Sequence, residues 1–360
     1  MESGDAGGLL NQRERLIKVL RKEQTDRKPF ICPGGMMTMI TTDVMESSGC
    51  FWPEAHGSAE KMATLTLAAH RFAGVENLGV PFCMTVEAEA MGAKVDLGTR
   101  ESEPKVVSYA INTLEELDKL LPLDANKGRA KVCTDAIRIL KGKAPEAPII
   151  ANVTGPISLA TSLIDPLIYY RAIKKKKAAA HRLTHTVTEN LITFGRAMLH
   201  AGADLICIAD PSATGEIIGR KAFEEFVLPS MNRMIDRFRS EFNAPSIVHI
   251  CGNVRTLGSA LAGIASEAIS VDSMVSIALL KQMTGQHIAM GNVSTYLLAQ
   301  GNADAVLKSA MACLTRGVDI LAPACGISPK TPLKNVRSLL QAALQMGRRN
   351  LRADESGNRD

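Results

Sequence analysis

The stretch Ser246-Ile247-Val248-His249-Ile250, followed by Cys251-Gly252, shows the pattern that decides the fold. It is a short run of mainly apolar residues that stops at polar and glycine residues, as a buried strand of a parallel sheet does. Most runs of this kind along the chain are followed by a short polar loop and then by a helical pattern. We count eight runs, at residues 30–32, 77–80, 148–152, 204–209, 246–250, 268–271, 287–290 and 319–322.

Eight strand-and-helix units predict a closed (β/α)8 TIM barrel of the α/β class. An open doubly wound sheet has the same alternation and is the alternative. We expect the barrel to span residues 30–347, after an N-terminal helical extension at residues 1–29. Within this extension, residues 12–22 have the pattern of an amphipathic helix. Residues 348–360 form a polar C-terminal tail.

The long gap between the second and third runs, residues 81–147, is predicted to be an insertion in the barrel and not a second domain. Helical patterns cover residues 109–121 and 130–141. The polar stretch 87–105 predicts a small β excursion at the rim of the barrel.

The composition narrows the class of function. The 360 residues are 46% hydrophobic and 22% charged, which is typical of a globular protein. A net charge of +5 and an aromatic content of 4% argue against a nucleic-acid partner. No apolar run approaches the roughly 18 residues that span a bilayer, and the first residues lack the pattern of a secretion signal. We therefore expect a cytoplasmic protein without a membrane partner, either a monomer or a weak homodimer.

Polar residues follow the predicted strands, where a TIM barrel carries its active site. His249 and Cys251 are two residues apart in an extended segment, so both side chains face the barrel mouth. Cys325 ends the eighth run, and a closed barrel brings it to the same rim. One histidine and two cysteines form a known catalytic zinc arrangement that leaves one position for substrate or water. The alternative is a core histidine beside a core cysteine.

The other cysteines do not fit such a site. Cys32 and Cys207 lie within strand runs, and Cys133 and Cys313 lie within helical patterns, so we assign all four to the core. Cys83 is the remaining candidate at the rim. The chain also lacks the phosphate loop, the dinucleotide fingerprint, the His-Glu-x-x-His motif and the serine-nucleophile elbow. Nucleotide-binding and serine-hydrolase functions therefore have little support.

Four segments in order resemble one family: Pro-Phe-Cys-Met-Thr-Val-Glu-Ala-Glu at 81–89, Ala-Asp-Pro-Ser-Ala-Thr-Gly-Glu at 209–216, His-Ile-Cys-Gly-Asn at 249–253 and Met-Gly-Asn-Val-Ser-Thr at 290–295. They resemble methylcobamide:coenzyme M methyltransferases, part of the uroporphyrinogen decarboxylase superfamily of (β/α)8 barrels. The resemblance covers roughly residues 11–345.

The resemblance implies a zinc ion held by His249, Cys251 and Cys325. It also implies transfer of a methyl group from a methyl-Co(III) corrinoid to a zinc-activated thiol such as coenzyme M, as in the one-carbon metabolism of methanogenesis. A bound Zn²⁺ deprotonates a coordinating thiol, which makes it a nucleophile at neutral pH.

Three carboxylates are candidates for a fourth zinc ligand, for an orienting contact to His249 or for binding the acceptor: Glu87, Asp210 and Glu216. We favour Asp210 for a catalytic role because it follows its strand immediately. Glu87 and Glu216 are assigned to substrate binding.

Asn152, Asn253 and Asn292 are also assigned to substrate binding, as hydrogen-bond donors to corrinoid amides or acceptor oxygens. Asparagine equally often forms turns, which is the alternative for each of them.

The corrinoid must come from elsewhere, because the chain has no Asp-x-His-x-x-Gly signature of a cobalamin-binding module. The expected donor is a separate methylated corrinoid protein or free methylcobalamin, and the expected acceptor is a small thiol. The rim loops show no obvious Arg/Lys cluster for the sulfonate of coenzyme M, and backbone amides at helix N-termini are the alternative.

Three other functions stay open. The first is a metal-free decarboxylase of the uroporphyrinogen type, although the loop at residues 32–37 offers no arginine for propionate groups. The second is methyl transfer to tetrahydrofolate or another acceptor. The third is a corrinoid- or zinc-binding accessory protein without activity.

Overall fold

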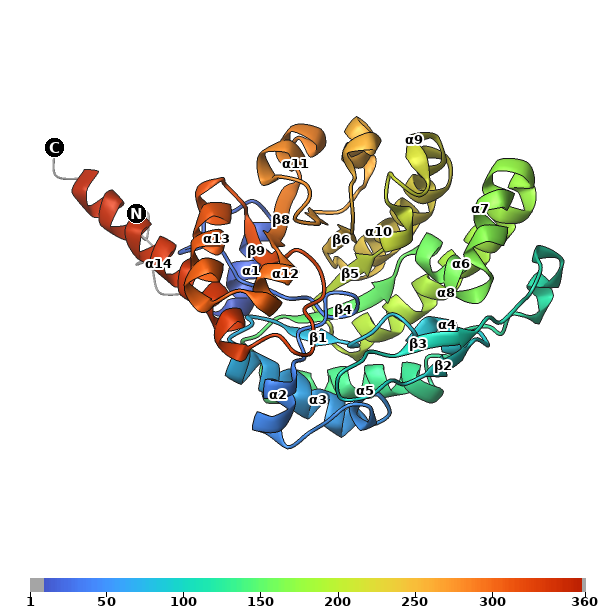
Figure 1. Cartoon of the computed structure of the whole chain (residues 1–360), viewed down its shortest axis with the longest axis horizontal. Helices are drawn as coiled ribbons and strands as arrows, with labels where there is room; N and C mark the ends of the chain where they lie inside the picture. Colours follow the sequence, from blue (N-terminus) through green and yellow to red (C-terminus); the bar gives the residue numbers. More distant parts are fainter. Residues whose placement is uncertain (1–9, 358–360) are drawn as a thin grey trace.

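Seven parallel strands form one curled sheet in the order β1-β4-β5-β6-β7-β8-β9 in the computed structural model, which describes residues 10–357 (Figure 1). This order, in which each strand of the sheet pairs with the next, is that of a TIM barrel and confirms the predicted fold class. The strands are β1 (Leu78–Val80), β4 (Ile149–Thr154), β5 (Leu205–Ala209), β6 (Ser246–Ile250), β7 (Ala268–Val271), β8 (Ile288–Val293) and β9 (Ile320–Pro323).

The first predicted strand, residues 30–32, lies between β9 and β1 and closes the barrel with few backbone hydrogen bonds. Phe30 bridges Leu321 of β9 in parallel, and on the other side the amide of Glu76 donates to the Phe30 carbonyl at 3.0 Å. The side chain of Asn77 replaces further backbone pairing: it accepts from the Cys32 amide at 2.8 Å and donates to the Cys32 carbonyl at 3.1 Å.

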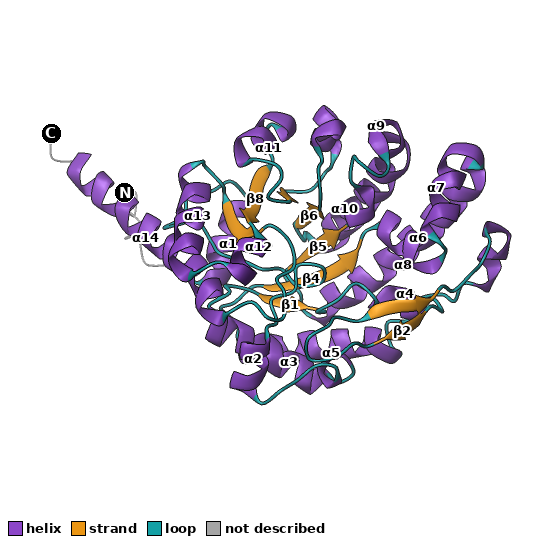
Figure 2. Ribbon diagram, viewed as in Figure 1, coloured by secondary structure: helices purple, strands orange, loops and turns teal. Residues whose placement is uncertain are grey.

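Helices cover the outside of the sheet (Figure 2). They are α2 (Thr42–Ser48), α3 (Ala59–Ala68), α5 (Gly128–Lys143), α6 (Pro156–Leu163), α7 (Pro166–Lys175), α8 (Lys177–Ala201), α9 (Gly219–Ala222), α10 (Leu228–Phe242), α11 (Ile277–Thr284), α12 (Thr295–Gln300), α13 (Ala303–Thr315) and α14 (Leu333–Gly357).

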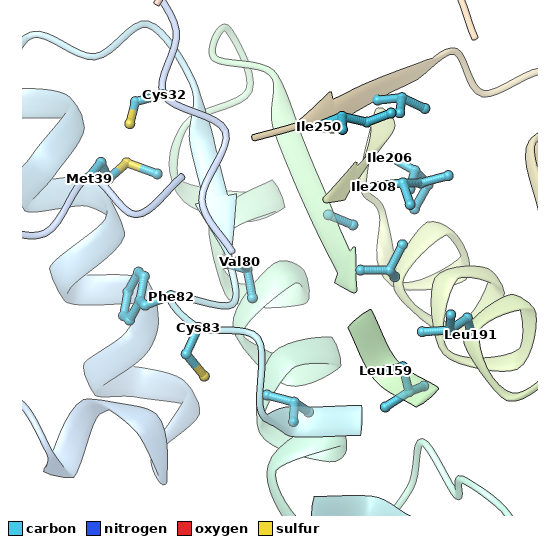
Figure 3. Packing of buried hydrophobic residues seen from close by; sticks show 14 of the residues in the cluster. Cys32, Met39, Val80, Phe82, Cys83, Leu159, Leu191, Ile206, Ile208 and Ile250 are labelled. Atoms are coloured by element: carbon cyan, nitrogen blue, oxygen red, sulfur yellow. The ribbon is translucent and has the colours of Figure 1, made fainter. Parts of the chain in front are cut away.

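Successive side chains of a strand point alternately into two hydrophobic cores. In β5, Ile206 and Ile208 belong to the cluster between sheet and helices, on the side of Leu191 of α8 (Figure 3). Leu205 and Cys207 of the same strand belong to the smaller cluster inside the barrel. This two-residue alternation is what directs every second side chain of β6 toward the barrel interior.

Helix α1 (Gln12–Leu20) covers the amino-terminal end of the barrel. Its buried Leu16, Val19 and Leu20 pack on the interior residues nearest that end, among them Ile150, Leu205, Ile247, Ala268, Ile288 and Ile320. The helix confirms the predicted one and ends two residues earlier, because Lys22 takes a left-handed backbone angle of φ 61°. The carboxyl-terminal end, called the mouth below, lies opposite.

The insertion contains the predicted β excursion as an antiparallel hairpin, β2 (Lys94–Asp96) and β3 (Lys105–Ser108), which follows the short helix α4 (Val86–Ala90). The helix predicted at 130–141 is confirmed within α5. The helix predicted at 109–121 is wrong, since only a 3-10 helix forms, at Leu114–Lys119. The amides of Ala110 and Ile111 both donate to the Leu163 carbonyl, which ties this segment to the end of α6.

Helix α14 continues through residues 348–357, where we expected the polar tail to begin. Residues 1–9 of the predicted extension and 358–360 of the predicted tail lie outside the described residues, and the proposed domain boundaries stay predictions. None of the helices within residues 10–357 has the length and apolar character needed to cross a membrane.

Candidate metal centre

Three side chains converge at the mouth. Ligand atoms of His249, Cys251 and Cys325 all lie within 4.8 Å of one another. The two Sγ atoms are 3.7 Å apart. His249 is completely buried, whereas both cysteines are partly exposed, so the group is reached from solvent on the side of its thiols.

The register between β6 and β7 explains the neighbours of this group. It pairs His249 with Ser270 and Ile250 with Val271, so Cys251 and Asp272 stand side by side just beyond the strands. Accordingly, Ser270 Oγ lies 3.0 Å from His249 Nδ1, and Asp272 Oδ2 lies 3.3 Å from Cys251 Sγ. Each of the two side chains is thus held by the residue opposite it on the next strand.

The second imidazole nitrogen of His249 is free to bind a metal ion. Nε2 of His249 is buried and has no hydrogen-bond partner among residues 10–357. Leaving a buried polar atom unsatisfied costs about 1–3 kcal/mol, and a metal bond would remove that cost. One imidazole and two thiolates match the ligand preference of Zn²⁺, and the contact at Nδ1 fixes the ring orientation that this bond needs.

The two thiols differ in acidity because they share a hydrogen bond. The contact to Cys325 Sγ, together with burial, raises the pKa of Cys251. The same contact lowers the pKa of Cys325, and it outweighs the opposing effect of burial there. The shared contact therefore favours one thiolate beside one thiol over two thiolates.

Asp210 lies outside this group. Its buried carboxylate accepts from the amide of Ile157 at 3.1 Å, from the amide of Ser158 at 2.9 Å and from Ser158 Oγ at 2.6 Å. These are the free amides of the first turn of α6, so Asp210 caps that helix from another strand. Burial raises its pKa to about 6.

The two predicted glutamates occupy different surroundings. Glu87 is buried on α4, where Oε1 accepts from the Thr154 amide at 2.7 Å. Its Oε2 is buried without a partner in the described part of the chain, and burial raises the pKa of the carboxyl. Glu216 is exposed in the loop after β5. Neither belongs to the group of His249, Cys251 and Cys325.

The asparagines hold loops of the barrel. The amide of Asn152 donates to the Pro33 carbonyl at 2.8 Å and to two further carbonyls. The amide of Asn292 donates to the carbonyls of Asp272 and Val275, at 3.0 and 2.6 Å, and so fixes the loop after β7. Oδ1 of Asn253 accepts a hydrogen bond from the Arg255 amide at 3.1 Å in the loop after β6.

Sequence reasoning assigned no role to Ser270, Glu103 or Asp272. For Ser270 and Asp272 the usable signal was strand register, because residues paired across neighbouring parallel strands lie side by side. Glu103 lies on the loop between β2 and β3, burial raises its pKa to about 7, and its charge acts on Cys325. Nothing in the sequence pattern places this loop near Cys325.

The remaining thiols are separate from the group. Cys83 is buried, where it accepts from Arg129 at 3.4 Å and contacts Thr85 Oγ1 at the same distance. The four cysteines that we assigned to the core, Cys32, Cys133, Cys207 and Cys313, are all buried, which confirms that prediction.

A parallel barrel with a buried imidazole and two thiols at the ends of its strands has the architecture of a TIM-barrel enzyme. The chain belongs to the uroporphyrinogen decarboxylase (URO-D) family, whose model matches residues 11–346.

Within that family, several similar proteins are methyltransferases. The methylcobamide:CoM methyltransferase MtbA of Methanosarcina acetivorans is 34% identical over 333 residues, which cover 92% of this chain and 97% of that protein. MtaA of Methanosarcina barkeri, of the same description, is 32% identical over 91% of this chain and 96% of its own length. The solved structure of a methyltransferase from Methanosarcina mazei superposes with a TM-score of 0.86 at 32% identity, covering 94% and 99% of the two chains.

Proposed function

We propose that this protein transfers a methyl group from a methyl-Co(III) corrinoid to a small thiol such as coenzyme M, with a zinc ion held by His249, Cys251 and Cys325. The single observation that supports this most strongly is the convergence of these three ligand atoms around the unpartnered Nε2 of His249. The similarity to methylcobamide:CoM methyltransferases supplies the donor and the class of acceptor.

In this proposal some residues bind the zinc ion and others orient the side chains that bind it. When bound by these ligands, Zn²⁺ would lower the pKa of the acceptor thiol, so that a thiolate exists at neutral pH. Ser270 holds the ring plane of His249 through its contact with Nδ1. Asp272 keeps the Cys251 side chain turned toward Cys325.

The transfer itself is a displacement at the methyl carbon. A lone pair of the acceptor sulfur forms the new sulfur–carbon bond, and the electron pair of the cobalt–carbon bond stays on cobalt, which goes from Co(III) to Co(I). The proton of the acceptor thiol is released to solvent. The role of the barrel is to hold the acceptor in line with the methyl group, which accounts for much of the rate of such reactions.

The donor must approach over the mouth, and exposed apolar side chains surround that approach. Ile217, Met274 and Tyr296 follow β5, β7 and β8, and their exposed fractions are 53%, 55% and 77%. Exposed apolar side chains at one end of a protein are typical of an interaction surface. They support the proposal that a methylated corrinoid protein docks here.

The metal-free decarboxylase is the weaker candidate. It leaves the buried Nε2 of His249 and the adjoining thiol pair without a function.

The test is to incubate the zinc-loaded protein with methylcobalamin and 2-mercaptoethanesulfonate under anaerobic conditions. We expect the absorbance of methylcobalamin to fall and the methylated thiol to accumulate in equal amount. Tetrahydrofolate in place of the thiol is the comparison for the acceptor. Methylcobalamin that stays intact with every acceptor, while the protein contains zinc, would contradict the proposal.

A further inference from the structure

Several cationic side chains on the loops and helices that follow the strands have partners of their own. Arg129 pairs with Glu89, Arg220 with Glu224 and Lys330 with Glu101, and Arg100 stacks on the ring of Phe51 at 4.0 Å. Arg255, in the loop after β6, forms no ion pair with any residue in the described part of the chain. It is exposed and lies four residues after Cys251.

A chain of contacts links the guanidinium of Arg255 to the metal centre. Nη2 of Arg255 donates to the Met274 carbonyl at 3.0 Å. The Met274 amide donates to Asp272 Oδ1 at 3.0 Å, and the other oxygen of that carboxylate lies 3.3 Å from Cys251 Sγ. A single residue of backbone therefore separates the guanidinium from the carboxylate that contacts a candidate ligand.

The loops on both sides of Arg255 are held in place. Its own amide donates to Asn253 Oδ1 at 3.1 Å, and the Asn253 carbonyl accepts from Thr214 Oγ1. The opposite loop is fixed by Asn292, which donates to the carbonyls of Asp272 and Val275. The guanidinium is thus positioned before any ligand arrives, which reduces the entropic cost of binding.

The donors that Arg255 retains suit a particular chemical group. A guanidinium has five N–H donors, and the contact to Met274 uses one of its nitrogens. The remaining donors can bind a planar or tetrahedral oxyanion through two parallel hydrogen bonds. Asp272, Glu103 and Glu216 are the acidic groups near the metal centre and disfavour an anion beside them, and the cations named above are already engaged, so an anionic end would settle at Arg255.

We propose that Arg255 binds the anionic end of the thiol acceptor and thereby sets the preference for small thiols that carry a sulfonate or carboxylate. This inference rests on the proposed function, because it assumes that a thiol reaches the metal centre. It goes further by naming the residue and the charge of the acceptor.

The experiment is a calorimetric titration of the zinc-loaded protein with 2-mercaptoethanesulfonate and, separately, with the uncharged 2-mercaptoethanol. We expect Arg255→Gln to weaken binding of the sulfonate thiol about tenfold to a hundredfold, as loss of a charge-assisted hydrogen bond does. It should leave binding of 2-mercaptoethanol within about twofold of the unmodified protein. Arg255→Lys should recover part of the loss, since it keeps the charge without the paired donors.

Arg220→Gln is the matched control. It removes the same charge from the neighbouring helix α9, but from a side chain already paired with Glu224, and should change neither titration. Zinc content measured by mass spectrometry should be equal in all variants. Equal binding of the sulfonate thiol by the Arg255→Gln variant and the unmodified protein would overturn the inference, and so would a sulfonate thiol that fails to bind the unmodified protein.

Methyl transfer from methylcobalamin distinguishes this failure from failure of the proposed function. If Arg255-dependent binding is found but methylcobalamin is never consumed, the proposed function fails and the inference stands. If methyl transfer to the thiol proceeds and is indifferent to Arg255, the inference fails and the proposed function stands.

Discussion

At the amino-terminal end of the barrel, buried charges are paired. Arg15 donates to Asp26 at 2.7 and 2.8 Å and to Glu76 at 3.2 Å, and Glu76 also accepts from Arg27 and from the Phe30 amide. At the mouth, by contrast, the buried Nε2 of His249 and Oε2 of Glu87 have no partner within residues 10–357. The buried charged groups named at the amino-terminal end thus have partners, whereas two ionisable groups at the mouth lack one in the described part of the chain.

This difference separates what holds the fold from what serves function. Buried polar groups that are fully paired stabilise one conformation, whereas unpaired ones lower the stability and persist where a ligand will use them. The helix α1 seals the first end with apolar side chains, and the second end is reached through partly exposed thiols. The two ends should therefore respond differently to mutation.

The largest effect is expected from Cys325→Ala at the mouth. Losing a ligand should abolish stoichiometric zinc and reduce methyl transfer by more than about a hundredfold, since even residues behind a ligand are worth about 10- to 100-fold. Zinc is measured by mass spectrometry and the fold by circular dichroism. The control is Cys207→Ala, which makes the same change inside the barrel, away from the mouth, and should retain zinc. Retention of zinc and activity in the Cys325 variant would remove it from the ligand set.

Leu16→Ala at the amino-terminal end should act on stability alone. The truncation leaves a cavity where α1 packs on the barrel interior and should lower the free energy of unfolding by about 2–5 kcal/mol. Urea titration measures this loss, and the folded variant should bind zinc in the same ratio as the unmodified protein. Loss of zinc from the folded variant would show that the two ends are coupled.

Asp272→Asn should have an intermediate effect at the mouth. Removing the negative charge beside Cys251 should weaken zinc binding about 10- to 100-fold, as changes in contacts behind a metal ligand commonly do. Competition with a chromogenic chelator measures the affinity. An unchanged affinity would mean that Asp272 only shapes its loop.

Asp210→Asn makes the same chemical change after β5, two strands away from β7, and should have the smallest effect on zinc binding at neutral pH. The pKa of Asp210 in the folded protein is raised from 3.8 to about 6, so between these values the folded state holds a proton that the unfolded state has released. The stability of the unmodified protein relative to the variant should therefore fall as pH rises through this window. Unfolding by urea at several pH values measures it.

Zinc affinity at neutral pH is the second measurement on this variant. It should equal that of the unmodified protein, because both carboxylate oxygens of Asp210 are engaged with α6. A marked fall in affinity would instead place Asp210 among the residues that support the metal.

Much of the fold and the centre of the site could be predicted from local pattern. Apolar runs marked the strands, and the two-residue period placed His249 and Cys251 on one face. The weak pairing of the first strand was less visible, although Pro29 and Pro33 flank it and remove two amide donors.

Contacts between distant segments could not be predicted in this way. Asp210 caps a helix that begins 54 positions earlier, at Pro156, and the loop that carries Glu103 reaches Cys325 from an insertion. Neither relation leaves a periodic signal. Strand register, once known, supplies Ser270 and Asp272 directly.

The central claim is that His249, Cys251 and Cys325 hold one zinc ion. The most direct test is the metal content of the purified protein by mass spectrometry, with His249→Ala measured alongside. We predict about one zinc ion per chain in the unmodified protein and none in the variant. Equal zinc in both, or no zinc in the unmodified protein after reconstitution under reducing conditions, would contradict the claim.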